Sequence, residues 1–176
     1  FPGATVGLTR ATKLRRTFAS GPMTMYDDAI AFLAKVEDPA RQEWNSREKF
    51  TAQQLDALRQ QFPGIPDDFL AYLREIGSGA FREGQFTIYG FLLTPEDLFG
   101  DGVLSRMEPA PRFLCFGDDF SGNVSGFLPA NGWVVAELTH EDGMTRETSK
   151  SFGQYIRDQL LMAPDGSDLR GCRSIE

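Results

Sequence analysis

The hydrophobic pattern of this chain changes its period at Gly77, and that change limits the possible folds more than any other feature. Before Gly77, apolar residues recur every three to four positions, which is the spacing of one face of a helix. After Gly77, short segments such as 86–89 alternate and others such as 113–116 are continuously apolar, as strands are. Helices followed by strands, without βαβ alternation, predict an α+β domain.

Three helices are predicted in the first half, over 26–37, 51–62 and 66–76. Thr51 and Gln54 match a capping box, in which each side chain bonds the backbone of the other residue. Pro66 suits the first turn of a helix because that position needs no backbone N–H donor. A fourth helix is predicted from Ser151, where Gln154 completes a second capping box, and Pro164 ends it.

Between these helices, the strands are predicted at 86–89, 91–93, 113–116, 124–128, 133–138 and 144–147. Asn131-Gly132 indicates a two-residue hairpin turn. We interpret Gly77-Ser78-Gly79 as a connector and Gly100–Pro111 as a loop after a short helical turn at Thr94-Pro95.

These elements predict a single α+β domain with N-terminal helices, a central, mostly antiparallel twisted sheet and a C-terminal closing helix. A chain of 176 residues is long enough for one domain with a real core. We assign the domain to residues 23–163. Residues 1–22 are expected to be a disordered or non-native basic extension, and 164–176 a polar tail with little to hold it.

Charge is distributed unevenly along the chain. Residues 1–22 hold four basic residues and no acid, so the rest of the chain carries 14 basic and 25 acidic residues and a net charge of −11. A field of this sign favours basic partners and repels nucleic acid. No apolar run approaches the roughly 20 residues that cross a bilayer, so we expect no membrane partner.

Cysteine and histidine are too few for a disulfide scaffold or a structural zinc site. Cys115 and Cys172 are far apart and have no C-x-x-C spacing, and His140 is the single histidine. Cys115 lies in an apolar strand and is expected to be buried. These features favour a reducing, cytoplasmic location and no metal or cofactor.

The segment 112–128 reads as a strand, a polar loop and a strand. Asp118, Asp119, Ser121 and Asn123 supply the loop with oxygen donors. They are either a functional cluster or residues that bond their own backbone and stabilise a turn, and we favour the turn. Neighbouring residues of a strand point to opposite faces, which disfavours joint catalysis by the two aspartates. The spacing also differs from a calcium-binding EF-hand loop.

Aromatic residues divide between core and surface. Phe69, Leu73, Phe152 and Tyr155 are expected in the core. Trp44 stands in a polar stretch and is either a plug under a loop, the commoner outcome, or an exposed anchor for a partner. If Phe120 and Trp44 are exposed, they are candidate anchors of a protein interface. His140 is interpreted as a solvated turn residue.

Three segments, in order, resemble the SUKH superfamily, which includes fungal cell-wall-synthesis regulators and bacterial immunity proteins. They are Ile65–Leu73, Phe116–Asn123 and Ser151–Ile156, within roughly residues 50–161. After Gly77 the chain reads Ser-Gly-Ala-Phe, where the family pattern is closer to Asn-Gly-Gly. Residues 26–49 lie outside the resemblance.

The resemblance implies a binding protein without catalytic chemistry. Its cognate partner would be a toxin domain, often a nuclease or deaminase, and the acidity of this chain suits a basic partner. We therefore expect a monomer or weak dimer that neutralises a toxin. The partner-binding residues would be Asp118, Asp119, Phe120, Ser121, Asn123 and Trp44. A general protein-binding scaffold and a small metal-dependent hydrolase are the alternatives.

Overall fold

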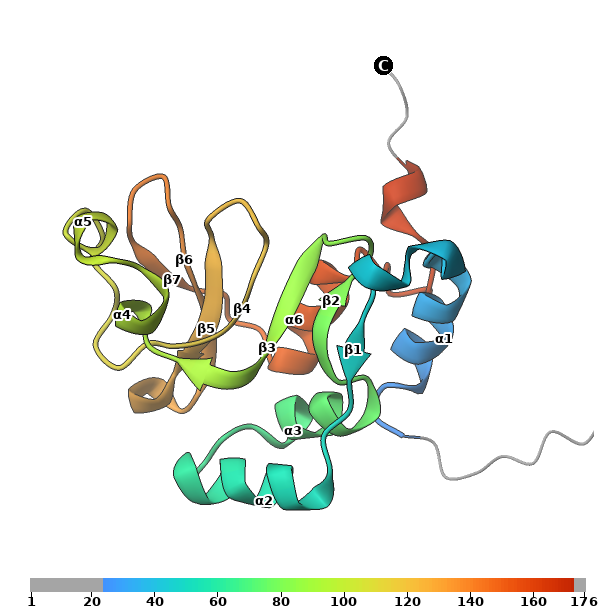
Figure 1. Cartoon of the computed structure of the whole chain (residues 1–176), viewed down its shortest axis with the longest axis horizontal. Coiled ribbons are helices and arrows are strands. Elements are labelled where there is room, and N and C mark those ends of the chain that lie inside the picture. The colour runs from blue at the N-terminus through green and yellow to red at the C-terminus, as the bar shows by residue number, and fades with distance from the viewer. Residues whose placement is uncertain (1–23, 173–176) are drawn as a thin grey trace, which may run out of the picture.

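A computed structural model of the chain describes residues 24–172 (Figure 1). The predicted extension 1–22 and the last residues of the predicted tail therefore lie outside the described part. Helices surround one seven-stranded sheet, and a helix closes the C-terminal side, so the predicted α+β class is confirmed. None of the helices in the described part is long and apolar enough to cross a membrane.

The sheet is an antiparallel meander in which every strand pairs with the next one along the chain. Its strands are β1 (Arg47–Glu48), β2 (Ser78–Phe81), β3 (Phe86–Leu93), β4 (Leu114–Asp118), β5 (Val124–Leu128), β6 (Val134–Leu138) and β7 (Thr145–Glu147). Because directions alternate, segments 82–85, 119–123 and 139–144 lie at one end of the sheet (Figure 1, top). We call these three segments the loop rim.

Helices cover both faces of the sheet. They are α1 (Asp27–Val36), α2 (Ala52–Gln61), α3 (Asp67–Glu75), α4 (Pro95–Leu98), α5 (Asp101–Leu104) and α6 (Phe152–Gln159). Short 3₁₀ segments are η1 (Pro39–Trp44), η2 (Pro129–Asn131) and η3 (Leu169–Cys172). The predicted helices and both predicted capping boxes, at Thr51 and Ser151, are confirmed.

The main core lies between the sheet and helices α3 and α6. In Figure 1, α6 lies behind β2 and β3. Phe69 meets Phe152 edge-on with 5.0 Å between ring centres, and Phe127 at 5.4 Å. Such aromatic pairs add roughly 0.5–1.5 kcal/mol beyond area burial. The predicted core residues Phe69, Leu73, Phe152 and Tyr155 are all buried.

Helix α1 is joined to this core through Tyr26, just before its first turn. The Tyr26 N–H donates to Glu75 on α3 at 2.9 Å, and the Tyr26 hydroxyl donates to the Asp68 carbonyl at 2.9 Å. Asp68 in turn accepts from the Gly153 N–H at the start of α6. Helix α1 and the residue before it are thus an integral layer of the domain.

A second, smaller core lies on the opposite face, under α4 and the segment that follows it. Cys115 is fully buried there, as predicted. Burial, with the nearby carboxylates of Glu96 and Asp97, raises the pKa of the Cys115 thiol to about 12. The thiol therefore stays protonated and unreactive at neutral pH.

Three local predictions were wrong, and the first two concern strands whose pairing partners lie elsewhere in the sequence. Residues 78 and 79 belong to β2, which pairs with β1, rather than to a connector. Glycine is needed at position 79 because a Cβ there would lie 2.1 Å from the Ser46 carbonyl oxygen, and β1 could not approach so closely. The expected break at Gly90 is an irregularity within one continuous strand, β3. The loop Gly100–Pro111 contains the short helix α5.

The connection between β5 and β6 also differs from its prediction. Asn131-Gly132 does not form a two-residue turn, because Pro129 starts the 3₁₀ turn η2. Gly132 then adopts a left-handed conformation with φ 73° at its end. The signal for a sharp reversal was correct, but proline added a turn before it.

The expectation that the tail has little to hold it is wrong for residues 164–172. The Leu169 N–H donates to the Leu161 carbonyl at 2.9 Å. Asp168 pairs with Arg82, and Arg170 with Glu83, both on the turn between β2 and β3. That turn lies more than 80 residues earlier in the chain, so no local pattern could reveal these contacts.

Candidate functional site

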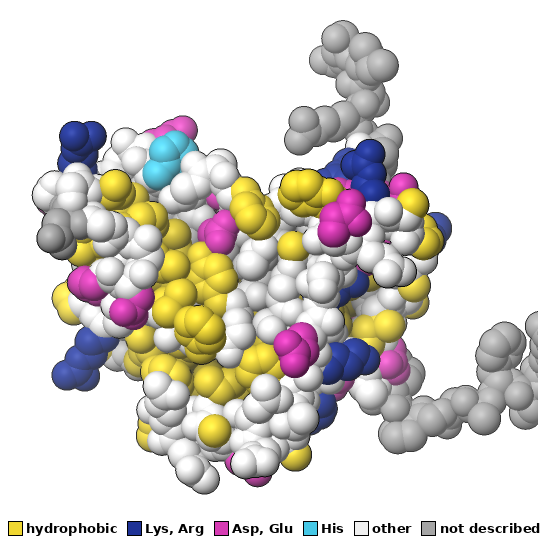
Figure 2. Space-filling model, in the orientation of Figure 1, with side chains coloured by type: hydrophobic (Ala, Val, Ile, Leu, Met, Phe, Trp, Pro, Cys, Tyr) yellow, Lys and Arg dark blue, Asp and Glu magenta, His cyan; other side chains and the backbone are white. Residues whose placement is uncertain are grey.

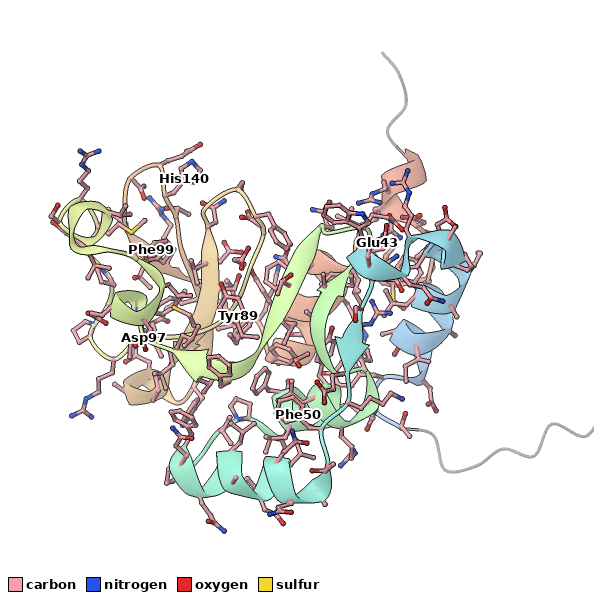
Figure 3. The ribbon with its side chains drawn as sticks, in the orientation of Figure 1. Glu43, Phe50, Tyr89, Asp97, Phe99 and His140 are labelled. Carbon is pink, nitrogen blue, oxygen red and sulfur yellow. The ribbon has the colours of Figure 1, made fainter. Side chains whose placement is uncertain are left out.

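The loop rim collects the residues that the sequence singled out. Asp118 ends β4, and its partner Thr87 is the second residue of β3, so loop 119–123 and turn 82–85 are neighbours at the same end. A Cβ on Gly84 would lie 3.6 Å from the ring of Trp44, which places Trp44 against that turn. In Figure 3, the labelled Glu43 and His140 mark the two sides of this end of the sheet.

Loop 119–123 is braced by its own side chains. Asp118 Oδ1 accepts from the Phe120 N–H at 2.8 Å. Asp119 Oδ1 accepts from the Ser121 N–H at 2.9 Å and the Ser121 hydroxyl at 2.7 Å. Asn123 Nδ2 donates to Asp119 Oδ2 at 2.8 Å. These bonds are those of the predicted turn-stabilising role.

The same hydrogen bonds favour the ionised form of the Asp119 carboxyl group. Burial alone would raise the pKa of Asp119, but the hydrogen bonds from Asn123 and Ser121 outweigh it and lower that pKa below its ordinary value. Asp119 is therefore ionised at neutral pH. His140 is exposed, as predicted, and its backbone N–H donates to Asn123 Oδ1 at 3.1 Å, which joins the loop to turn 139–144.

Phe120 projects from this braced loop with 63% of its surface exposed. Its φ is 59°, a left-handed conformation that costs a non-glycine residue about 1–2 kcal/mol. A strained conformation persists only where the surrounding structure enforces it, and here the bond to Asp118 does so. The loop thus holds a large apolar ring in water.

Trp44 is also exposed, by 56%, so the plug interpretation is wrong. The reason is that η1, which ends at Trp44, has no buried residue and packs beside turn 82–85 rather than over the core. Two aromatic side chains from distant parts of the chain therefore stand at the same end of the sheet.

The neighbouring aspartates serve opposite faces of the sheet, as the strand geometry predicted. Asp118 Oδ2 accepts from the Tyr89 hydroxyl at 2.7 Å on the face covered by α4. Asp119 lines a cavity on the face covered by α6. They do not form a paired carboxylate site, and the described residues contain no group of three His, Cys, Asp or Glu side chains that could hold a metal ion.

An apolar groove of about 270 Å³ lies on the α4 side of the loop. It is lined by Tyr89, Leu98, Phe99, Asp118, Phe120, Gly122 and Val124. Figure 3 shows Tyr89, Asp97 and Phe99 on this face, and Figure 2 shows hydrophobic side chains gathered over it. Phe91, on the same strand as Tyr89, is 60% exposed.

A polar cavity of about 70 Å³ lies on the other side of the loop. Its lining is Phe86, Asp119, Asn123, Ser125, Glu137, Thr139, Tyr155 and Gln159. Ser125 lies directly opposite Glu137 in the β5–β6 ladder. The Tyr155 hydroxyl, from α6, donates to Glu137 Oε1 at 2.7 Å and lies 2.6 Å from Ser125 Oγ.

This cavity was missed from the sequence. The available signal was a single polar residue inside each of two apolar strands, Ser125 and Glu137, and their pairing was unknown. Tyr155 fits the apolar face of its helix, so nothing marked its hydroxyl as part of a polar site. Burial raises the pKa of Tyr155 above its ordinary value, so the phenol stays neutral.

Three carboxylates in or next to the loop rim have no ion-pair partner within the described chain, although Glu83 and Asp142 of the rim pair with Arg170 and Arg146. Asp118, Asp119 and Glu137 have no Lys, Arg or His nitrogen within 4 Å among the described residues, whereas most described arginines are in ion pairs. These three side chains therefore have no cation of the described chain to balance them.

Comparisons of the chain with protein-family models, with curated proteins and with solved structures found no match.

Proposed function

We propose that this protein is a SUKH-like immunity protein that binds a cognate toxin domain through the loop rim and neutralises it by covering its active surface. The observation that carries the proposal is Phe120, an exposed aromatic ring held in a strained conformation by the carboxylate of its neighbour Asp118. Strain of this kind concentrates at functional positions, and aromatic anchors dominate interface energies.

Charge supports a basic partner. Asp118 and Asp119, which directly precede Phe120 and have no ion-pair partner among the described residues, would meet positive charge on a nuclease-like or deaminase-like toxin. The overall acidity of the chain would speed their encounter. The apolar groove beside Phe120 offers room for a hydrophobic side chain of the partner. Trp44 would contribute a second anchor at the far side of the rim.

Binding, without catalysis, is the proposed mode of action. Asp118 and Asp119 bond their own loop and stand on opposite faces, so neither is arranged to assist the other in chemistry. The inhibitor would act by occupying the surface that a toxin needs for its substrate.

The decisive experiment co-expresses the protein with the product of the adjacent gene. Rescue from toxicity together with co-purification is expected, and survival without a complex would contradict the proposal. A stable complex without rescue would instead indicate a scaffold. Phe120→Ala should weaken binding at least about tenfold, the effect of an interface anchor. Ile30→Ala, at an exposed apolar residue of α1, is the matched control and should leave binding unchanged.

A further inference from the structure

In the polar cavity behind loop 119–123, the hydroxyl groups of Ser125, Thr139 and Tyr155 already donate their protons to neighbouring acceptors. Tyr155 donates its proton to Glu137, so the 2.6 Å contact with Ser125 requires the Ser125 hydroxyl to donate to Tyr155. Thr139 donates to Asp142 at 2.6 Å. The hydroxyl groups of the cavity therefore present lone pairs, not protons, to whatever enters.

Acceptors are in excess in the same space. Glu137 Oε2 has no hydrogen-bond partner among the described residues, and Asp119 Oδ2 has one, from Asn123. Two carboxylates thus face a cavity whose remaining donor is the side-chain amide of Gln159, which makes no hydrogen bond within the described chain. Such a lining fits a group that carries positive charge and several donors.

The cations that lie nearby in the chain are engaged elsewhere. Arg146 stands opposite Glu137 in the β6–β7 ladder, yet its guanidinium binds Asp142 and Thr139. Lys150 interacts with the charge of Glu137, but its ammonium pairs with Asp158 at 2.7 Å. Neither reaches the carboxylate of Glu137 within 4 Å.

Size limits the occupant. The cavity holds about 70 Å³, well below the roughly 300–1,000 Å³ of pockets that take a whole small molecule. It is still several times the roughly 10–15 Å³ that one water molecule needs. The head group of one side chain matches this space. Asp119, Asn123 and Thr139 place the cavity at the loop rim, where a bound protein could reach it.

We propose that this cavity receives one basic side chain of the partner, whose charged head donates hydrogen bonds to Glu137 and Asp119. This inference rests on the proposed function, because a partner must supply the side chain. Phe120 would then bind an apolar part of the partner on one side of the loop, and the cavity would bind a charged side chain on the other side. We call the cavity in this role the socket.

The cavity can be tested without any partner. The full chain, labelled for NMR, is titrated with n-butylammonium and ethylguanidinium, which carry the lysine and arginine head groups. Tetramethylammonium, with the same charge and no donor, is the matched probe at equal ionic strength. We expect either donor cation to shift the Ser125 and Glu137 amide signals to saturation, and tetramethylammonium to leave them unsaturated. Equal responses, or saturation by none, would overturn the proposal.

Two isosteric variants complete the test. Glu137→Gln retains an acceptor for Tyr155 but loses the charge, and it should weaken binding of the donor cation about tenfold or more. Glu141→Gln removes an exposed carboxylate from the same rim and should have no effect. Unchanged cation binding in Glu137→Gln would refute the socket.

The partner complex separates the two proposals. If the wild-type protein binds and neutralises the toxin and Glu137→Gln does so equally well, the socket is wrong while the proposed function stands. If no toxin is bound, the proposed function is wrong. The socket then has no partner to recognise, even if the small cations bind in the cavity.

Discussion

The guanidinium of Arg82 is 1% exposed and forms an ion pair with Asp168, 86 residues later in the chain, at 2.8 Å. It also lies over the ring of Phe32, with 5.4 Å from its carbon to the ring centre. Arg82 Nε and Nη1 have no hydrogen-bond partner in the described chain. Asp168 is therefore the main compensation for a buried charge, and it ties the C-terminal segment to the sheet.

Asp168→Ala should lower the free energy of unfolding by about 2 kcal/mol. Removing one partner of a fully buried pair costs about 3–5 kcal/mol, and the 34% exposure of the Asp168 side chain reduces this. Denaturant unfolding of the full chain measures the loss. The double variant Arg82→Met with Asp168→Ala should recover most of it, because no unpaired charge remains. A loss from the double variant as large as from the single one would contradict this account.

The contribution of Asp168 should disappear in acid. The hydrogen bond from Arg82, which outweighs burial, lowers the pKa of Asp168 in the folded protein below its ordinary value of about 3.9. Stability from this group is therefore complete above that ordinary value and is lost as pH falls through the lower folded-state pKa. The difference in unfolding free energy between wild type and Asp168→Asn should shrink between neutral pH and about pH 3. A constant difference would show that charge is not its source.

The tyrosines should resist ionisation until the protein unfolds. Burial raises the pKa of all four, Tyr26, Tyr72, Tyr89 and Tyr155, above the ordinary value of about 10. A raised folded-state pKa stabilises the fold below the unfolded-state value, and that stability is lost as pH rises beyond it. Tyrosinate absorbance should therefore appear together with loss of circular dichroism. Ionisation near pH 10 in a folded protein would contradict the burial.

Gly117→Ala should destabilise the protein by about 2 kcal/mol, within the range for overpacking. A Cβ at this position of β4 would lie 2.3 Å from the Thr87 carbonyl oxygen and 2.7 Å from the ring of Phe86. The neighbouring strand would have to move, which would disturb the rim above it. Gly100→Ala, where a Cβ meets nothing within 4 Å, is the matched control and should change thermal stability little. Equal effects of both substitutions would refute the close approach of β3 and β4.

Phe120→Gly should separate stability from binding. Glycine adopts a φ of 59° freely, so the free energy of unfolding should stay level or rise by up to about 1 kcal/mol. Partner affinity should fall, because the exposed ring is lost. Thermal unfolding and co-purification, measured on the same preparation, check both outcomes. A stability loss above about 1 kcal/mol would show that the ring packs on the fold instead.

Local signals predicted the elements whose causes are local. Thr51 with Gln54 and Ser151 with Gln154 form the capping boxes that their spacing indicated, and the apolar face of α3 is buried. The loop after β4 bonds itself as expected, because Asp118 and Asp119 need partners only a few residues away. The prediction failed at Gly79 and in the C-terminal segment, where the partners are Ser46 and Arg82.

Sequence alone determined the fold class, the helix starts and the braced loop with its acidic character, because periodicity, capping and turn chemistry act over a few residues. Only the tertiary structure decided that Trp44 stands beside the same rim as Phe120 and that Ser125 and Glu137 share Tyr155. These relationships depend on strand register and on helix packing, which join residues distant in the chain. A change of register by one residue would turn Ser125 to the other face and abolish the cavity.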